Sequence, residues 1–293
     1  MRPDAERVLP WLLRAGWVAM AVVAAAAIDE ATADRSAPVH DVARFGGAAV
    51  WLAGVAAMAI PSVLGLTATR IIVPTAVPAA ALASIAGARG AAGIGFLVAA
   101  IAVTVVACSA DLGRAFAQGS AYGDERRYPL RPPAAYALAT LVSWSVWTAS
   151  LLAGPLLLAA RQWVPGAVLT VLAAGGLVWA WPRWHRLARR WLVVVPAGLV
   201  VHDHLVLAET LMLRRTEIAA LRLAPAATGA LDLTGPATGH AVEIVTREPV
   251  TVILAASPRE PRGRPVHLTA CLVAPSRPGR ALAAAAGRRL SVG

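Results

Sequence analysis

The sharpest candidate for chemistry in this sequence is the run His202-Asp203-His204. On a β-strand, side chains two residues apart point to the same face, so the two imidazoles could share a metal ion. A complete site needs further ligands, and the nearest candidates along the chain are Glu209, His240 and His267. The alternative interpretation is an ordinary polar end of a β-hairpin. We therefore keep His202 and His204 as weak metal candidates and expect no resident metal or cofactor.

Motifs of common membrane enzymes and nucleotide-binding proteins are missing. The chain has no Gly-x-Ser-x-Gly, no His-Glu-x-x-His and no Lys for a phosphate-binding loop. The central parts of its apolar segments hold no ionisable side chain, although transport paths usually depend on one. Ser143, Trp147 and Ser150 share one helix face, which predicts a helix–helix contact. A substrate path along that face is the alternative, and an enzyme is not the expected function.

Arginine is the second feature with chemical consequences. All 27 basic residues are Arg, and the formal net charge is +11. Seven of them lie in two stretches beside the last apolar segments: Arg126, Arg127, Arg131, Arg183, Arg186, Arg189 and Arg190. Basic groups next to a bilayer attract anionic lipid by about 1 kcal/mol each, so anionic lipid of the inner leaflet is a predicted partner. The alternative is that these residues only fix the topology. No nucleic-acid partner is expected, because no base-reading motif accompanies the charge.

The elements that carry these residues follow from composition. Hydrophobic residues make up 58% of the 293-residue chain and charged residues only 15%, whereas a soluble domain has about 45–50% and about 25%. Six stretches are apolar enough to cross a membrane: Trp11–Ile28, Gly46–Leu66, Ile71–Gly87, Ala91–Ala110, Ala134–Ala160 and Trp163–Trp181. The third and fourth predict a tight helical hairpin, with a re-entrant pair as the alternative.

The charges between these stretches predict the topology. Residues 29–44 are net acidic, whereas residues 111–133 and 183–190 are rich in Arg. Arg-rich segments stay in the cytoplasm, so six crossings place both the N-terminus and the C-terminal domain on the cytoplasmic side of a bacterial plasma membrane. A cleaved signal peptide is the alternative for the first segment. Cys108 and Cys271 fall in unrelated segments and predict two small buried hydrophobic residues rather than a disulfide.

After Arg190 the pattern changes to short strands. Trp191–Val195 and Leu199–His202 predict a hairpin around Pro196-Ala197-Gly198. Further strands are predicted at 205–208, 211–214, 217–223, 230–233, 241–246, 250–255 and 266–273, with Ile218 and Leu221 facing inward. A final helix over 280–290 is predicted to have Ser276 as its N-cap and Pro278 in its first turn. The chain thus divides into 1–182, an Arg-rich linker over 183–190, and 191–293.

The segments Trp191–His202 and Leu213–Leu223 resemble the opening of bacterial pleckstrin-homology-like (PH-like) domains attached to membrane helices. The resemblance covers residues 191–293 and implies a small β-barrel or sandwich closed by a helix; a different small barrel is the alternative. As a whole, the chain resembles multi-pass membrane proteins of GC-rich actinobacteria, a family with no settled function to transfer.

The expected fold is therefore an α-helical membrane bundle followed by a PH-like β domain. The expected function is a non-enzymatic interaction or scaffold module at the inner leaflet, with other membrane or cytoplasmic proteins as further partners. A transporter component with a regulatory domain is the first alternative. A membrane enzyme that uses His202 and His204 is the second.

Overall fold

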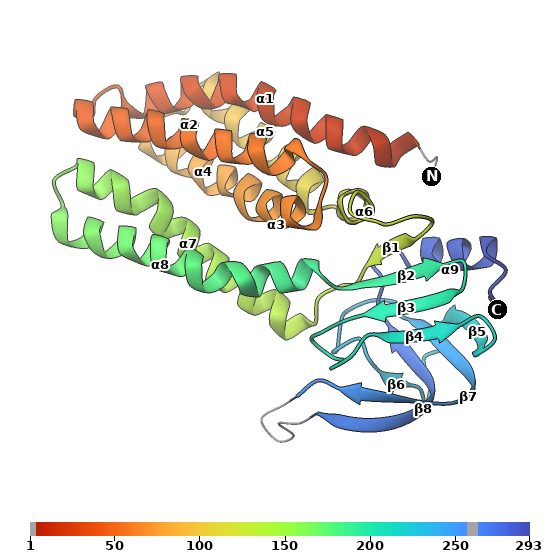
Figure 1. Ribbon diagram of the computed structural model, residues 1–293. Coiled ribbons are helices and arrows are strands. Elements are labelled where there is room, and N and C mark those ends of the chain that lie inside the picture. Colours follow the sequence, from red (N-terminus) through yellow and green to blue (C-terminus); the bar gives the residue numbers. More distant parts are fainter. Residues whose placement is uncertain (1–3, 257–262) are drawn as a thin grey trace. The chain divides into compact units, whose positions relative to one another are not determined.

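The structure is a computed structural model that describes residues 4–256 and 263–293. The chain forms two compact units. The helical unit contains residues 1–116 and 140–185, and the C-terminal unit contains residues 117–139 and 186–293. Each unit is described by itself below (Figure 1).

Within residues 4–256 and 263–293, six helical segments are long and apolar enough to cross a membrane, which agrees with the prediction of a multi-pass membrane protein. The helices are α1 (Asp4–Thr32), α2 (Ala37–Ala59), α3 (Val63–Ile72) with η1 (Val73–Thr75) and α4 (Ala76–Ala86), α5 (Ala91–Cys108), α7 (Ala134–Ala159) and α8 (Trp163–Ala188). Short α6 (Ala110–Gln118) follows α5. The third span, Val63–Ala86, is thus one helix interrupted at η1.

The boundary between the second and third spans differs from the prediction. The sequence pattern continued the second segment to Leu66, but α2 ends at Ala59 and a new helix begins at Val63. Pro61 interrupts the helical backbone, and the Ser62 hydroxyl caps the new helix by accepting a hydrogen bond from the Gly65 N–H at 3.0 Å. Arg70 therefore lies within the third span rather than in a loop before it.

The first helices pack around reciprocal tryptophan hydrogen bonds. The Trp17 indole N–H donates to the Trp51 carbonyl at 3.0 Å, and the Trp51 indole N–H donates to the Trp17 carbonyl at 3.1 Å. Gly54 makes this approach possible, because a Cβ at that position would lie 2.5 Å from the Trp17 ring. Both indole N–H groups are therefore satisfied in the apolar interior, as burial requires.

Helices α7 and α8 form a second layer of the helical unit through close contacts at small residues. A Cβ on Gly154 would lie 2.7 Å from Thr170, and one on Gly166 would lie 2.7 Å from Leu158. The predicted contact face of α7 is confirmed: the Ser143 hydroxyl accepts from the Trp184 indole at 3.1 Å, and the Trp147 indole donates to the Ala173 carbonyl of α8 at 3.1 Å.

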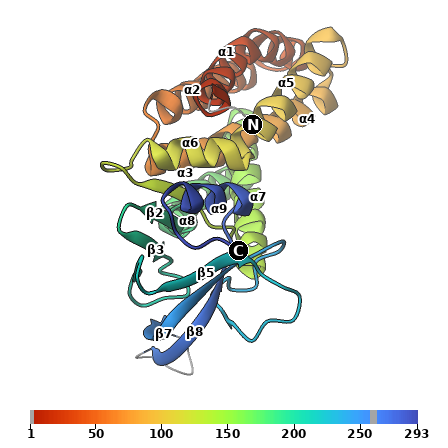
Figure 2. The same cartoon turned by 90° about the vertical axis from the view of Figure 1, so that its right-hand side faces the viewer.

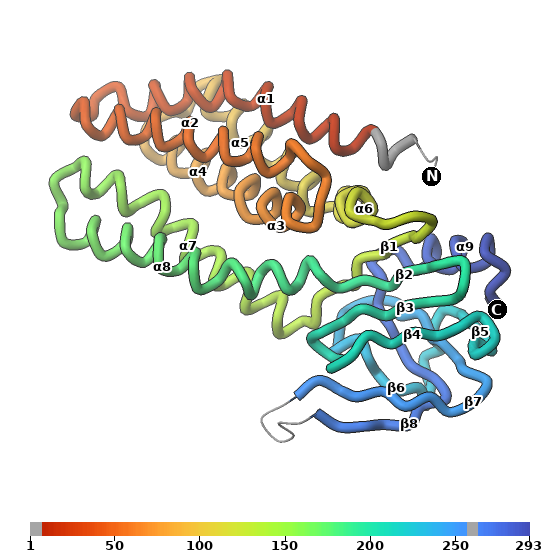
Figure 3. The backbone as a smooth tube through the Cα atoms, viewed as in Figure 1, coloured from red at the N-terminus to blue at the C-terminus, as the bar shows by residue number. Residues whose placement is uncertain are grey.

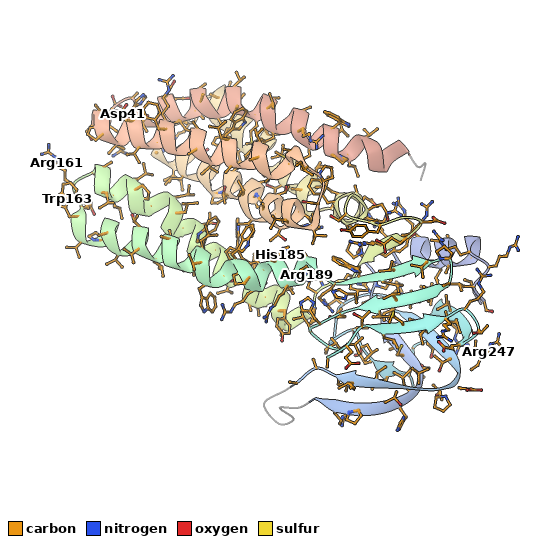
Figure 4. The ribbon with its side chains drawn as sticks, viewed as in Figure 1. Asp41, Arg161, Trp163, His185, Arg189 and Arg247 are labelled. Carbon is orange, nitrogen blue, oxygen red and sulfur yellow. The ribbon has the colours of Figure 1, made fainter. Side chains whose placement is uncertain are left out.

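The α7–α8 pair joins the rest of the helical unit at the interrupted third span. Pro74 lacks an N–H, so carbonyls in the preceding turn need other donors. The Trp144 indole donates to the Ile71 carbonyl at 2.9 Å, and the Thr67 hydroxyl is 2.8 Å from His185 Nδ1. Figure 4 shows His185 at one end of this unit and Asp41, Arg161 and Trp163 at the other.

The C-terminal unit is built from two four-stranded sheets and a helix. The first sheet has the order β1 (Arg126–Pro129), β2 (Trp191–Val195), β3 (Gly198–His202) and β4 (Leu211–Arg214). The second has the order β5 (Ile218–Leu223), β7 (Val242–Leu254), β8 (Arg264–Val273) and β6 (Leu231–Asp232). All neighbouring strands are antiparallel except β6 and β8. Helix α9 (Pro278–Gly287) lies beside β2 and β5 (Figure 2).

Strand β1 comes from the segment between the fourth and fifth spans, far from the rest of the domain in sequence. It pairs with β2 in the register Arg127 to Val193 and Pro129 to Trp191, and Figure 3 shows the two strands side by side. Tyr128 is 2% exposed and belongs to the core of the C-terminal unit. The unit therefore contains more than the predicted 191–293, because residues 117–139 also belong to it.

The remaining strand predictions hold in part. The hairpin of β2 and β3 is confirmed, and so are the inward positions of Ile218 and Leu221. The segments 241–246 and 250–255 are one strand, β7, with an irregular register between Val245 and Val250. The segment 205–208 forms only an isolated bridge at Leu207. Ser276 is not the N-cap of the last helix: that position is Arg277, which makes no side-chain cap.

Candidate functional site

Three side chains of the first sheet form a stack on its outer face. The Arg127 guanidinium lies 5.0 Å from the centre of the Trp191 ring. The His202 ring lies on the same indole, with ring centres 5.4 Å apart and planes inclined by 20°. Cation–π and stacking contacts of this kind favour a single arrangement of otherwise mobile side chains. We call Arg127, Trp191 and His202 the stack.

The strands place these residues together by their register. Trp191 of β2 lies opposite His202 of β3, and Arg127 of β1 lies opposite Val193. Because successive side chains of a strand alternate between faces, Leu192 and Val194 enter the core while Trp191, Val193 and Val195 point outward. The first residue of β3, Gly198, has to be glycine, because a Cβ at this position would lie 2.0 Å from the Leu213 carbonyl oxygen.

A shallow recess of about 200 Å³ adjoins the stack. Its lining consists of Glu125, Arg127, Trp191, Val193, Val195, Val200, His202 and Thr210. The apolar part of the lining consists of Val193, Val195 and Val200, which we call the valine floor, and the polar side chains lie around it. Arg127 is held by Glu125, whose Oε1 lies 2.7 Å from Nη2 and 3.0 Å from Nε. His202 Nδ1 lies 3.0 Å from the Thr210 hydroxyl.

The two weak metal candidates do lie close together, with ring centres 6.0 Å apart. Only His202 belongs to a strand, because β3 ends there. Of the other suggested ligands, Glu209, His240 and His267, the last has its Nδ1 2.8 Å from the Thr251 hydroxyl. Within the described ranges, no cluster of three or more His, Cys, Asp or Glu side chains could hold a metal ion.

The electrostatic potential at the stack is positive. Burial lowers the pKa of His202, and the charges of Arg189 and Arg127 lower it further against an opposing effect of Asp203. Burial also lowers the pKa of His204, with a further contribution from His202. Both imidazoles therefore stay neutral at neutral pH, since their ordinary pKa is about 6.5.

Mild acid is expected to destabilise the C-terminal unit because of these two histidines. Their folded pKa values lie below those of the unfolded chain, so the unfolded chain takes up protons first and stability falls as the pH drops below about 6.5. The midpoint of thermal unfolding should fall between about pH 7.5 and about pH 5.5. The variant His202→Gln/His204→Gln should lose less over this interval. Equal losses in both proteins would contradict the prediction.

Asp203, the middle residue of the candidate motif, has a different role. Its carboxylate pairs with Arg190 through two hydrogen bonds of 2.7 and 2.6 Å, and both side chains are only 1% exposed. Arg190 also donates to the Arg131 carbonyl at 2.9 Å, and Asp203 accepts from the Leu205 N–H at 3.1 Å. The pair thus ties the start of β2 to the end of β3. Arg190 was predicted to face lipid, and its burial excludes that role.

The other six arginines of the predicted lipid contact fall into two groups. Arg127 is held in the stack, and Arg131 donates to the His240 carbonyl. The exposed members are Arg126, Arg183, Arg186 and Arg189. Arg183 lies 4.0 Å from the centre of the Trp179 ring, close to the end of α8. Residues 183–188 are helical, so the predicted linker is mostly the last turns of α8.

Neither cysteine is in a disulfide. Cys271 is fully buried in the core of the C-terminal unit, and burial raises the pKa of its thiol to about 12. Cys108 is exposed at the end of α5, so the prediction that both cysteines are buried is wrong for this residue. With so high a pKa, the Cys271 thiol is protonated at neutral pH and is a poor nucleophile.

Sequence reasoning missed the stack and the Arg190–Asp203 pair. Both depend on pairing between segments that are distant along the chain, and only the Trp191–His202 part was open to prediction from the hairpin. Comparison with protein-family models, with curated proteins and with solved structures finds no match. The function therefore has to be argued from the site itself.

Proposed function

We propose that this protein is a non-enzymatic integral membrane protein whose C-terminal unit is an interaction module at the inner leaflet of a bacterial plasma membrane. Both the N-terminus and the C-terminal unit would be cytoplasmic. The observation that carries the proposal is the exposure of four arginines: Arg183 in the last turns of α8, and Arg126, Arg186 and Arg189 in the C-terminal unit.

Chain connectivity supports a contact between this group and the bilayer surface. Helix α8 ends at Ala188 and β2 begins at Trp191, so only two residues separate a candidate span from the first sheet. Trp179 and Arg183 form a pair typical of the headgroup region, where an indole and a cation meet the lipid surface. The next arginines, Arg186 and Arg189, lie within two turns of that pair.

The plan of the C-terminal unit supports a PH-like interaction domain. Two small sheets and a closing helix agree with that plan, and β1 is an additional strand from the membrane half of the chain. The Arg-only usage and high alanine content support an actinobacterial source. In a domain of this kind, cytoplasmic or membrane proteins are the further partners we propose.

Charge removal in the intact protein tests the lipid contact. The variant Arg126→Gln/Arg186→Gln/Arg189→Gln removes three exposed charges, and Arg214→Gln/Arg215→Gln/Arg247→Gln is the matched control. Arg189 and Arg247 lie on opposite sides of the C-terminal unit in Figure 4. At about 1 kcal/mol for each Arg, the first variant should retain anionic lipid roughly 100-fold less tightly. Native mass spectrometry of protein released from mixed-lipid nanodiscs measures the retention.

Three results would contradict the proposal. The first is equal lipid retention by both triple variants. The second is a reporter fused after Gly293 that is active outside the cytoplasm, because it would reverse the topology. The third is turnover of a substrate that depends on His202 or His204, because it would make the protein an enzyme.

A further inference from the structure

The recess beside the stack has features of a small-molecule site that the lipid contact does not use. Its polar groups surround an apolar floor made by Val193, Val195 and Val200. Sites for small ligands generally combine an apolar surface with a few fixed polar groups. We propose that this recess binds a small amphipathic carboxylate, with the apolar body on the valines and the carboxylate at Arg127 and His202.

Arg127 can hold such a carboxylate without leaving its present partner. The guanidinium has five N–H donors in a planar fork, and Glu125 uses only those of Nε and Nη2. Among the described residues, none accepts a hydrogen bond from Nη1. The indole of Trp191 fixes the plane of the guanidinium, so little side-chain entropy remains to be lost when a ligand binds.

His202 offers a second donor beside the first. Its Nδ1 lies 3.0 Å from the Thr210 hydroxyl, which is able to donate to it. In the tautomer in which Nδ1 accepts from this hydroxyl, the proton is on Nε2, and Nε2 has no partner within residues 4–256 and 263–293; the proposal uses this tautomer. Stacking on Trp191 holds this ring as well.

Charge complementarity favours an anion in the recess over a cation. The groups that face His202 are Arg127 from β1, Arg189 from the segment after α8, and Asp203 and His204 from the segment after β3. Asp203 is already paired with Arg190. Glu125, the one acid of the lining, accepts from Arg127 and from the Tyr122 N–H at 2.7 Å. The net effect at the imidazole is that of positive charge.

The valine floor further restricts the class of ligand that fits the recess. An ion such as acetate would accept hydrogen bonds from the donors but would leave the valine side chains exposed to water, whereas a ligand that also covers these side chains gains the favourable free energy of apolar burial. A carboxylate with a flat apolar body satisfies both requirements. Benzoate is the simplest probe of this kind, and benzylamine has a similar shape with the opposite charge.

Calorimetric titration of the full chain in nanodiscs of neutral lipid tests the proposal. Benzoate should bind at least 10-fold more tightly than acetate, and benzylamine should not bind measurably. Arg127→Gln should weaken benzoate binding at least 10-fold, whereas Arg247→Gln, which also removes one arginine charge from the C-terminal unit, should leave it unchanged. Val200→Ser should weaken it about 3-fold while leaving the Arg127–Glu125 pair in place.

The outcomes separate this proposal from the lipid contact. Equal binding of benzoate to the wild type and to both Arg127→Gln and Val200→Ser would overturn it, and so would preferential binding of benzylamine. If Arg127→Gln fails to fold, the benzoate affinity of Val200→Ser tests the proposal alone: weaker binding supports it and unchanged binding overturns it. Loss of benzoate affinity in nanodiscs of anionic lipid would show that headgroups fill the recess, which would overturn the small-molecule proposal and leave the lipid contact intact.

Discussion

Replacing Asp203 with Ala is expected to destabilise the C-terminal unit by about 3–5 kcal/mol. The change leaves the Arg190 guanidinium buried, 1% exposed, without its carboxylate partner. An unpaired buried charge costs far more than the net contribution of the pair itself, because its hydration is lost without compensation. Thermal unfolding of the full chain, followed by hydrogen exchange in β2 and β3, measures the loss.

Two further variants make this prediction specific. Arg190→Met/Asp203→Leu removes both charges together and should be less destabilising than Asp203→Ala, since no unpaired charge remains. Asp124→Ala removes the carboxylate that lies 2.6 Å from Arg288 at the surface, where the acid is 77% exposed. A surface pair contributes little, so this variant should stay close to the wild type. Similar losses for Asp203→Ala and Asp124→Ala would show that the buried pair has no special role.

Removal of β1 is expected to have a larger effect still. A fragment of residues 191–293 lacks the edge strand of the first sheet, and with it the core residues Tyr128 and Leu130. Loss of a buried aromatic side chain alone costs about 3–5 kcal/mol, which is comparable to the total stability of many domains. We therefore expect this fragment to be unfolded, as judged by the absence of protected amides.

The matched control restores the strand without the membrane helices. A protein in which residues 117–133 are joined to 186–293 by a flexible linker should regain the protected core. In the full chain, Tyr128→Ala should lower the thermal midpoint strongly, and Tyr128→Phe should lower it less because the aromatic ring is kept. A folded 191–293 fragment with native protection in β2 would show that β1 is dispensable.

The parts of the fold that could be predicted are those that depend on local pattern. Apolar stretches of about 20 residues identify candidate spans without knowledge of the neighbouring segments. Two valine-rich runs around a Pro-Ala-Gly turn predict the β2–β3 hairpin. The inward positions of Ile218 and Leu221 follow from the same local pattern. The helices and the β2–β3 hairpin form hydrogen bonds between residues that are close in sequence, which is why local pattern is enough to predict them.

The parts that could not be predicted depend on pairing across long stretches of chain. Strand β1 has only four residues, two of them Arg, and nothing local distinguishes it from the rest of an Arg-rich loop. Its partner lies beyond two spans. Arg190 likewise belongs to a run of arginines, all of which could serve to fix the membrane topology. Its pairing with Asp203 becomes visible only in the folded sheet. The recess is missed for the same reason, because β1, β2, β3 and Thr210 all contribute to it.

The origin of β1 has a consequence for the order of events during synthesis. About 60 residues lie between Pro129 and Trp191, and a ribosome adds about 5–20 residues each second. The β1 segment is therefore synthesised about 3–12 seconds before its partner strand β2. During that time the candidate spans α7 and α8 are synthesised, and an unpaired strand edge is open to association with other chains. Charged side chains on an edge strand oppose such association, so we expect Arg126 and Arg127 to protect the segment until β2 has been made.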